Sequence, residues 1–207
     1  MSRENILHRV RTALGRSGGA VPAVAPPVRL RIPEVPMEAR LASMKERIEA
    51  LAGKVVCGVD PRAWVAEAIA GKKAVASNSP VVAEYGITGL PEVASGFTDR
   101  DELRAACAAA DVGITGADYA LADTGTLVML ASEREARLVS LLPPWHIAVV
   151  PRERILTGLD ELFTLLPDPA GATSSMVLIT GPSRTADIEQ ILVRGVHGPG
   201  QITVVIP

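Results

Sequence analysis

The sequence predicts an α/β protein built on a mostly parallel, doubly wound sheet. Short apolar runs rich in Val, Ile and Leu recur after residue 54, and segments with recognisable helix starts separate several of them. These runs are continuous rather than alternating, a pattern typical of strands covered on both faces by helices. We therefore expect one such domain over residues 37–207, preceded over residues 1–36 by a helix and a Pro-rich arm.

Length and composition fit a folded chain of this kind. The 207 residues suit one domain with an extra arm, and hydrophobic residues make up 48% of them. The formal net charge is −2 and only 3% of the residues are aromatic, so the sequence offers neither a basic track for a phosphate backbone nor a platform for stacking bases. We expect no nucleic-acid partner.

The two cysteines and the N-terminus indicate a cytoplasmic protein. Cys57 and Cys107 stand in unrelated apolar settings outside any metal-ligand spacing, so we expect two buried thiols in a reducing compartment and no metal site. The segment MSRENILHRV lacks the apolar block of a signal peptide. No later run approaches the roughly 18 apolar residues of a membrane span, so none is expected.

Two helices are expected before the first strand. Residues 3–14 predict a short basic helix, because apolar side chains recur on one face and Gly15 follows as a stop. Five prolines across residues 16–36 resist both helix and central strand, which makes this part an arm or linker. Over residues 37–52 the apolar spacing alternates between three and four, which predicts a helix that packs on the core or, alternatively, on a partner helix.

Strands and further helices then alternate along the chain. The expected strands are 55–57, 73–76, 112–115, 126–130, 146–150, 176–180 and 202–206. One helix start is the N-cap acid Asp60 before a proline, and two more are the capping-box patterns Thr98-x-x-Asp101 and Thr157-x-x-Asp160. A last helix is expected over residues 185–194, ending at Gly195.

Polar and glycine-rich loops follow or precede several of these strands. In open parallel sheets ligands bind at the carboxyl ends of the strands, so we expect these loops to converge on one cleft. Their hydroxyls, amides and imidazoles are candidate contacts to an anionic ligand, and their acids and one accessible histidine are candidates for proton transfer. The candidate catalytic residues are Asp118, Asp123 and His197. The candidate ligand contacts are Thr115, Gly116, Thr124, Gly125, Thr126, His146, Gly181, Ser183, Arg184 and Thr185.

Each of these segments also has a purely structural interpretation. The stretch TGPSRTADIE is a capped helix start rather than a phosphate cradle, because Asp187 and Glu189 already occupy the first turn and would repel a phosphate. The stretch DTGT is a tight turn in which Gly125 supplies a positive φ angle. In this interpretation His146 is a core histidine at the start of a buried strand, hydrogen-bonded to the backbone. The nucleotide-binding motifs G-x-x-x-x-G-K-[ST] and G-x-G-x-x-G are absent, as is the hydrolase motif G-x-S-x-G.

Three ordered motifs resemble the LUD-domain family: ITGADYALADTGTLVML, LVSLLPPWHIAVVPRERIL and ITGPSRTADIEQILVRGVHGPGQITVVI. The resemblance is dense from residue 111 to residue 206. It implies a fold similar to the sugar-phosphate isomerase and coenzyme A transferase superfamily. It also implies a role in oxidising L-lactate to pyruvate beside two partner proteins, at least one of which carries iron–sulfur clusters. Asp123 stands where the family is associated with Glu, a longer acid.

The sequence leaves three classes of function open. Lactate oxidation needs a flavin, nicotinamide or metal centre to take two electrons, and this chain has no binding signature for any of them. The favoured class is therefore an accessory component with a small carboxylate or phosphate ligand, whose iron–sulfur clusters sit on partner proteins. The alternative is a stand-alone enzyme acting on a sugar phosphate or acyl-coenzyme A, with Asp123 as base or nucleophile and Arg184 or His197 as anion contact. A structural scaffold is the third.

Overall fold

The structure is a computed structural model that describes residues 2–15, 32–185 and 193–207. The chain divides into two compact units, residues 1–30 and residues 31–207. In the first unit, helix α1 (Arg3–Ala13) is the helix expected at residues 3–14. The Ser2 side chain caps it by accepting a hydrogen bond from the Asn5 N–H at 3.3 Å. No side chain of α1 is buried.

The second unit is built on a parallel sheet, as predicted. In the described residues its six strands lie in the order β1 (Lys54–Cys57), β12 (Gln201–Ile206), β7 (Trp145–Val149), β4 (Val112–Gly116), β2 (Ala74–Ala76) and β3 (Val93–Ala94). Every neighbouring pair is parallel. Five of the predicted strands therefore lie in this sheet, and the α/β class is confirmed.

The other two predicted strands, 126–130 and 176–180, belong instead to a second sheet. Its order is β8 (Ile155–Leu156), β5 (Tyr119–Leu121), β6 (Thr126–Leu130) and β9 (Met176–Ile179). The β5–β6 and β6–β9 pairs are antiparallel, and only β5–β8 is parallel. A four-residue turn joins β5 to β6, and so short a connection can only join antiparallel neighbours, because parallel strands need a crossover of about a dozen residues.

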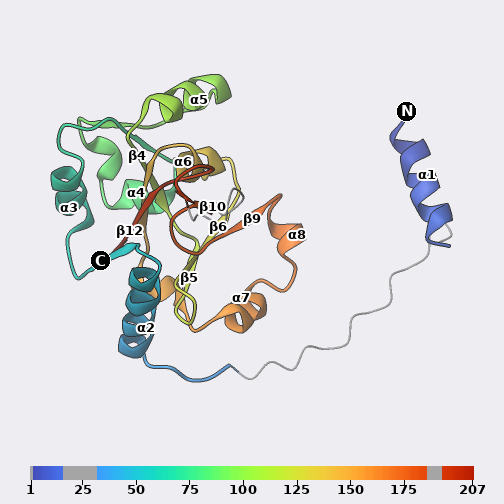
Figure 1. The fold of residues 1–207 in the computed structure, drawn as a ribbon, viewed down its shortest axis with the longest axis horizontal. Helices are drawn as coiled ribbons and strands as arrows, with labels where there is room; N and C mark the ends of the chain where they lie inside the picture. Colours follow the sequence, from blue (N-terminus) through green and yellow to red (C-terminus); the bar gives the residue numbers. More distant parts are fainter. Residues whose placement is uncertain (1, 16–31, 186–192) are drawn as a thin grey trace. The chain divides into compact units, whose positions relative to one another are not determined.

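Helices lie around the parallel sheet (Figure 1), and clusters of apolar side chains cover both of its faces. On one face α3 (Pro61–Ala68), α4 (Pro80–Glu84) and η1 (Ile87–Gly89) pack on β4 and β7. On the other face the second sheet and α2 (Met37–Ala50) pack on β7 and β12. The buried face of α2 is Leu41, Met44 and Ile48, so α2 is the core-facing helix that the apolar spacing predicts.

The remaining helices complete these layers. α5 (Arg100–Ala109) and α6 (Arg137–Leu141) enclose a small cluster around Val75 and Val139. α7 (Leu159–Leu165) packs Leu162 on the second sheet, and α8 (Pro169–Ala172) and η2 (Arg152–Arg154) lie in the connections. Among the described helices, none has the length and apolar character needed to cross a membrane.

One predicted helix start is correct and two are displaced by one residue. The Asp60 carboxylate caps α3 by accepting from the Arg62 N–H at 2.9 Å. The cap of α5 is Asp99 rather than Thr98, and its Oδ1 accepts from two backbone N–H groups at 2.9 Å each. The N-cap of α7 is Gly158 rather than Thr157. A spacing pattern does not specify which residue takes the extended backbone of an N-cap, so such displacements arise easily.

The predicted helix over residues 185–194 is wrong at both ends. There β10 (Arg184–Thr185) pairs antiparallel with β11 (Val193–Arg194). Residues 186–192 lie between these strands and outside the described residues, so the predictions for Asp187 and Glu189 fall on that part of the chain.

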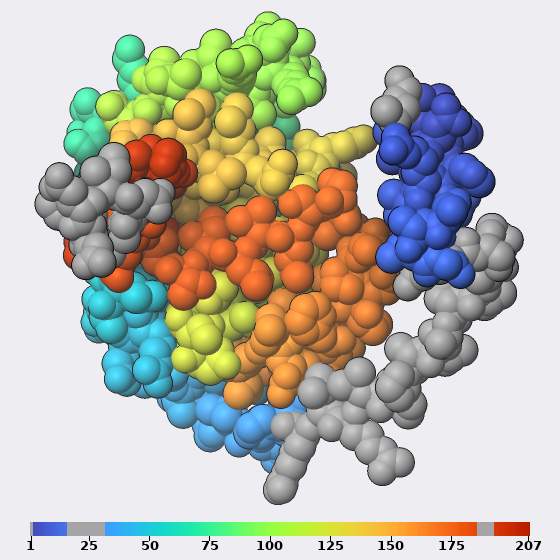
Figure 2. Space-filling model, turned by 45° about the vertical axis from the view of Figure 1, so that its right-hand side comes forward, coloured from blue at the N-terminus to red at the C-terminus, as the bar shows by residue number. Residues whose placement is uncertain are grey.

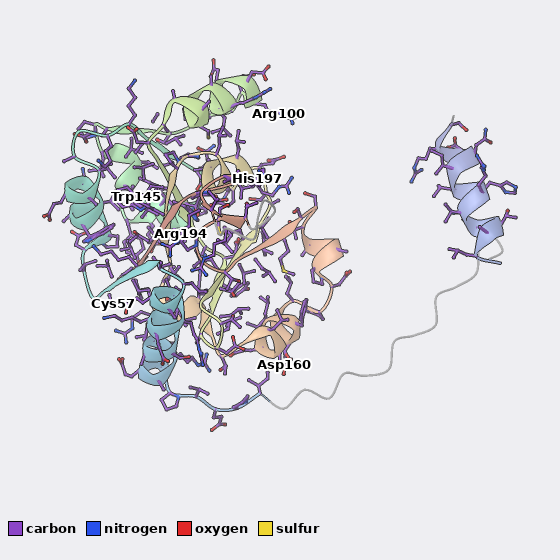
Figure 3. All side chains as sticks on the ribbon, viewed as in Figure 1. Cys57, Arg100, Trp145, Asp160, Arg194 and His197 are labelled. Atoms are coloured by element: carbon purple, nitrogen blue, oxygen red, sulfur yellow. The ribbon has the colours of Figure 1, made fainter. Side chains whose placement is uncertain are left out.

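The prediction of two buried thiols is wrong for one of them. Cys107 is buried, but Cys57 is exposed (Figure 3). Cys57 is the last residue of β1, which is an edge strand of the parallel sheet. An apolar sequence setting does not reveal that a strand lies at an edge.

Candidate functional site

Polar residues gather at the carboxyl edge of the parallel sheet, where β2 and β4 end side by side. Ser77 and Ser79 follow β2, and Asp118 follows the last residue of β4, Gly116. A Cβ atom on Gly116 would lie 2.5 Å from Ser79 Oγ. Only glycine allows this approach, so Gly116 brings the β4 backbone against the serines.

Glu135 enters the same edge from the segment between β6 and α6. The Ser77 hydroxyl donates to Glu135 Oε2 at 2.9 Å, and Glu135 is only 6% exposed. Its other carboxyl oxygen, Oε1, is buried and has no hydrogen-bond partner among the described residues. The stretch S-E-R-E-A has the composition of a solvated loop, and three of its residues, 132–134, are indeed exposed. Sequence reasoning missed Glu135 for that reason.

The two acids at this edge have raised pKa values. Burial raises the pKa of Glu135 to about 8, against the opposing hydrogen bond from Ser77 and with a further contribution from the Asp118 charge. Burial also raises the pKa of Asp118, although its hydrogen bond from the Leu130 N–H at 2.7 Å and the Arg154 charge act in the other direction. Glu135 therefore carries a proton near neutral pH. We call Ser77, Ser79, Gly116, Asp118 and Glu135 the edge site.

Two predicted ligand contacts, Thr115 and His146, lie in the core. Thr115 Oγ1 is 2.8 Å from His146 Nε2, and both residues are 0% exposed. Burial lowers the pKa of His146 to about 4, so its ring is neutral, and in the part of the chain that the structure describes its Nδ1 atom has no partner. His146 is therefore a buried core histidine, as the structural interpretation predicts. Its hydrogen bond is to the Thr115 side chain and not to the backbone. A ligand role for this pair stays a prediction.

A chain of hydroxyls runs from Asp123 along the turn between β5 and β6. Thr124 donates to Asp123 Oδ1 at 3.2 Å, and Thr126 donates to Thr124 at 2.8 Å. Thr126 has then used its only proton, so Thr180, 2.8 Å away, donates to Thr126. Gly125 has a φ angle of 68°, as the tight-turn interpretation predicts.

Three further predicted residues, Gly181, Ser183 and His197, share a hollow of about 210 Å³ with Thr180. The Ser183 N–H donates to the Pro199 carbonyl at 2.9 Å, which holds the loops around residues 181 and 198 together. Segments of α6 and β9 and the loop of residues 197–199 meet there on one face (Figure 2). Its lining is mostly apolar and includes Leu141 and Leu178. Arg184 and Thr185 follow in β10.

The predicted site residues therefore do not form one cleft. Gly116 and Asp118 lie at the carboxyl edge, Thr115 and His146 in the core, and the remaining described members along the hydroxyl chain, the hollow and β10. The strand-end rule applies to the first group because those residues directly follow a parallel strand. The hydroxyl chain lies on the turn between β5 and β6 of the second sheet, and the hollow is lined by α6, β9 and loops around residues 183 and 198, so that rule applies to neither.

A wider hollow, of about 670 Å³, opens at the opposite edge of the parallel sheet. Trp145 and Arg194 line it together with Lys72 and Asp111 (Figure 3). Lys72, Asp111 and Trp145 stand at or before the amino ends of β2, β4 and β7, away from the edge where parallel sheets bind ligands. Among the described residues, its lining contains no member of the predicted site. We therefore take the edge site as the candidate functional site.

The edge site is suited to binding and proton transfer. Its groups are two hydroxyls, two carboxyls and a closely packed glycine. Within the described ranges, no three His, Cys, Asp or Glu side chains lie where they could hold a metal ion. Fold and site together define an α/β protein with a polar strand-end cluster in which a carboxyl keeps its proton near neutral pH.

The chain belongs to the LUD domain family, whose model matches residues 41–206. It is 34% identical over 143 residues to lactate utilization protein C of Halalkalibacterium halodurans, an alignment that covers 65% of this chain and 62% of that protein. It is 37% identical over 146 residues to lactate utilization protein C 1 of Bacillus mycoides, with the same coverage. The chain thus spans about three fifths of the length of these relatives.

The fold also matches a solved structure. The crystal structure of a DUF162 family protein from Deinococcus radiodurans aligns with a TM-score of 0.63 and covers 83% of this chain and 98% of that one. The two sequences are 20% identical, so the likeness concerns the fold alone.

Proposed function

We propose that this chain is an accessory component of a lactate-utilization system in which L-lactate is oxidised to pyruvate. The observation that carries the proposal is its similarity to relatives named lactate utilization protein C, at 34% and 37% identity over more than 140 residues. The match of the LUD domain model to residues 41–206 supports it, because that range includes the whole edge site.

The proposal assigns electron transfer to partner proteins. Oxidation of lactate removes two electrons, which require a redox cofactor, and iron–sulfur clusters on the partners would supply it. This chain would contribute a protein surface and a site in which burial raises the pKa values of two acids, Glu135 and Asp118. The stand-alone enzyme with Asp123 as its base has less support, since Asp123 is exposed on a turn away from the edge site.

Deletion of the gene tests the proposal. The deletion strain should grow slowly or not at all on L-lactate and normally on pyruvate, and the intact gene should restore growth on lactate. Growth on pyruvate is the control, because it bypasses only the oxidation step. Affinity purification of the full chain from lactate-grown cells should yield iron–sulfur proteins. Normal growth on lactate in a strain without a paralogue would overturn the proposal.

A further inference from the structure

The edge site already holds a carboxyl group, which belongs to Glu135. The Ser77 hydroxyl donates to it at 2.9 Å, and the Gly116 N–H and the Ser79 hydroxyl also stabilise its charged form. Two hydroxyls and a backbone amide are the donors that proteins use to bind a small carboxylate. These donors are placed by the ends of β2 and β4, which are fixed by the parallel ladder.

Glu135 fits these donors imperfectly. Its Oε1 atom is buried without a hydrogen bond, and burying an oxygen in this way is unfavourable. Its neighbours on both sides in the chain, Arg134 and Ala136, are exposed or half-exposed, so Glu135 alone inserts. The turn that presents it is local, with the Ser132 hydroxyl accepting from the Glu135 N–H at 3.0 Å.

The segment around Glu135 covers a small hollow at the end of β2. The hollow measures about 30 Å³, and its lining includes Ser77, Asn78, Glu133, Arg134 and Val139. This volume holds one water-sized group. Ser77 and Ser79 are themselves buried, so an organic acid reaches them only when the segment moves outward.

We propose that residues 131–136 form a lid over a carboxylate-binding site, and that Glu135 in the closed form takes the place of the carboxylate of a small organic acid. Opening the lid withdraws Glu135 and leaves Ser77, Ser79 and the Gly116 N–H for the ligand. The ligand class is a small monocarboxylate. A phosphate dianion is disfavoured, because Asp118 adjoins the site and would repel the additional charge. The inference deepens the proposed function, on which the choice of pyruvate and L-lactate as probes rests.

Calorimetric titration of the full chain with pyruvate, L-lactate and inorganic phosphate tests the proposal. Glu135→Ala removes the competing carboxyl, so it should lower the dissociation constant for pyruvate or lactate about tenfold, as expected if the open form is a minor state of roughly 10%. Ser77→Ala in the Glu135→Ala background should abolish that gain. Ser95→Ala is the matched control, because Ser95 follows β3 at the same edge and its hydroxyl donates to the Thr88 carbonyl at 3.4 Å.

Two further measurements keep the test decisive. Glu135→Gln keeps the shape of the side chain, so it should bind pyruvate or L-lactate no more tightly than the unaltered chain does. This variant provides a test if Glu135→Ala does not fold. Amide hydrogen exchange of residues 131–136 should speed up when pyruvate or lactate is added to the unaltered chain. Weaker binding in a folded Glu135→Ala, equal affinity for phosphate, or no binding at all would overturn the lid. The lactate-growth result is independent of these outcomes, so the two proposals fail separately.

Discussion

His146 Nε2 lies 2.8 Å from Thr115 Oγ1, across the neighbouring strands β7 and β4, and neither residue is exposed. In the ladder, His146 stands directly opposite Gly113, which has no side chain. On the β4 side the imidazole therefore meets one glycine and one hydroxyl. Since Nδ1 has no partner, Thr115 provides the one side-chain hydrogen bond that the ring has in the described residues.

Thr115→Val should destabilise the protein by about 1–3 kcal/mol, because it keeps the volume of the side chain and leaves both ring nitrogens of His146 without a partner. Urea unfolding at pH 7 measures the change. The double variant Thr115→Val/His146→Phe should lose less than the sum of the two single losses, since no polar atom is then left unsatisfied. Strict additivity would contradict the pairing.

The stability should fall as the pH drops from about 6.5 to about 4. The folded state lowers the pKa of His146 to about 4, so across this window the unfolded chain binds more protons at this residue than the folded chain. The loss should be on the order of 3 kcal/mol and should be complete below the folded pKa. Chemical unfolding at several pH values measures it, with Thr115→Val/His146→Phe as the variant that lacks this part of the slope.

Glu135 should make the protein less stable as the pH rises. The folded state raises the pKa of Glu135 from 4.5 to about 8, so between these values the folded chain holds a proton that the unfolded chain has lost. The loss should reach a few kcal/mol by pH 8 and remain constant above it. Glu135→Gln should match the unaltered chain near pH 4.5 and exceed it in unfolding free energy at pH 9. Equal slopes for both proteins would exclude Glu135 as the source.

Gly113→Ala should be strongly destabilising. A Cβ atom at this position would lie 2.0 Å from the Val139 carbonyl oxygen, so α6 must move away from the sheet. We expect a loss of more than about 2 kcal/mol, seen as a lower melting temperature. Gly89→Ala is the control, because a Cβ there meets nothing within 4 Å. Similar melting temperatures for the two variants would show that α6 packs less closely than described.

Asp99→Ala should lower the stability by about 1 kcal/mol, since the Asp99 carboxylate caps two N–H groups of α5. Thr98→Ala should have almost no effect. The two neighbouring substitutions separate the cap seen in the structure from the one that the sequence pattern predicts, and thermal unfolding compares them. A larger loss of stability for Thr98→Ala than for Asp99→Ala would show that Thr98 is the cap, as the sequence pattern predicts.

Part of the edge site follows from the sequence. Gly116 and Asp118 come directly after a buried strand, and the strand-end rule alone makes them candidates. Ser77 and Ser79 follow another such strand, but no glycine or acid stands beside them in the sequence to mark a candidate site as at Gly116 and Asp118. Glu135 follows a strand of the second sheet and reaches the edge through tertiary contacts such as its hydrogen bond with Ser77, 58 positions away in the chain.

The sequence by itself determined the features that depend on near neighbours along the chain. These are the α/β class, five of the six described strands of the parallel sheet, the buried face of α2, the Asp60 cap and the positive φ angle of Gly125. Tertiary structure alone decided which strands belong to the second sheet, which thiol is exposed on an edge strand, and which acid is buried with a raised pKa. Burial and pKa depend on what packs against a residue from distant parts of the chain, and periodicity does not record those partners.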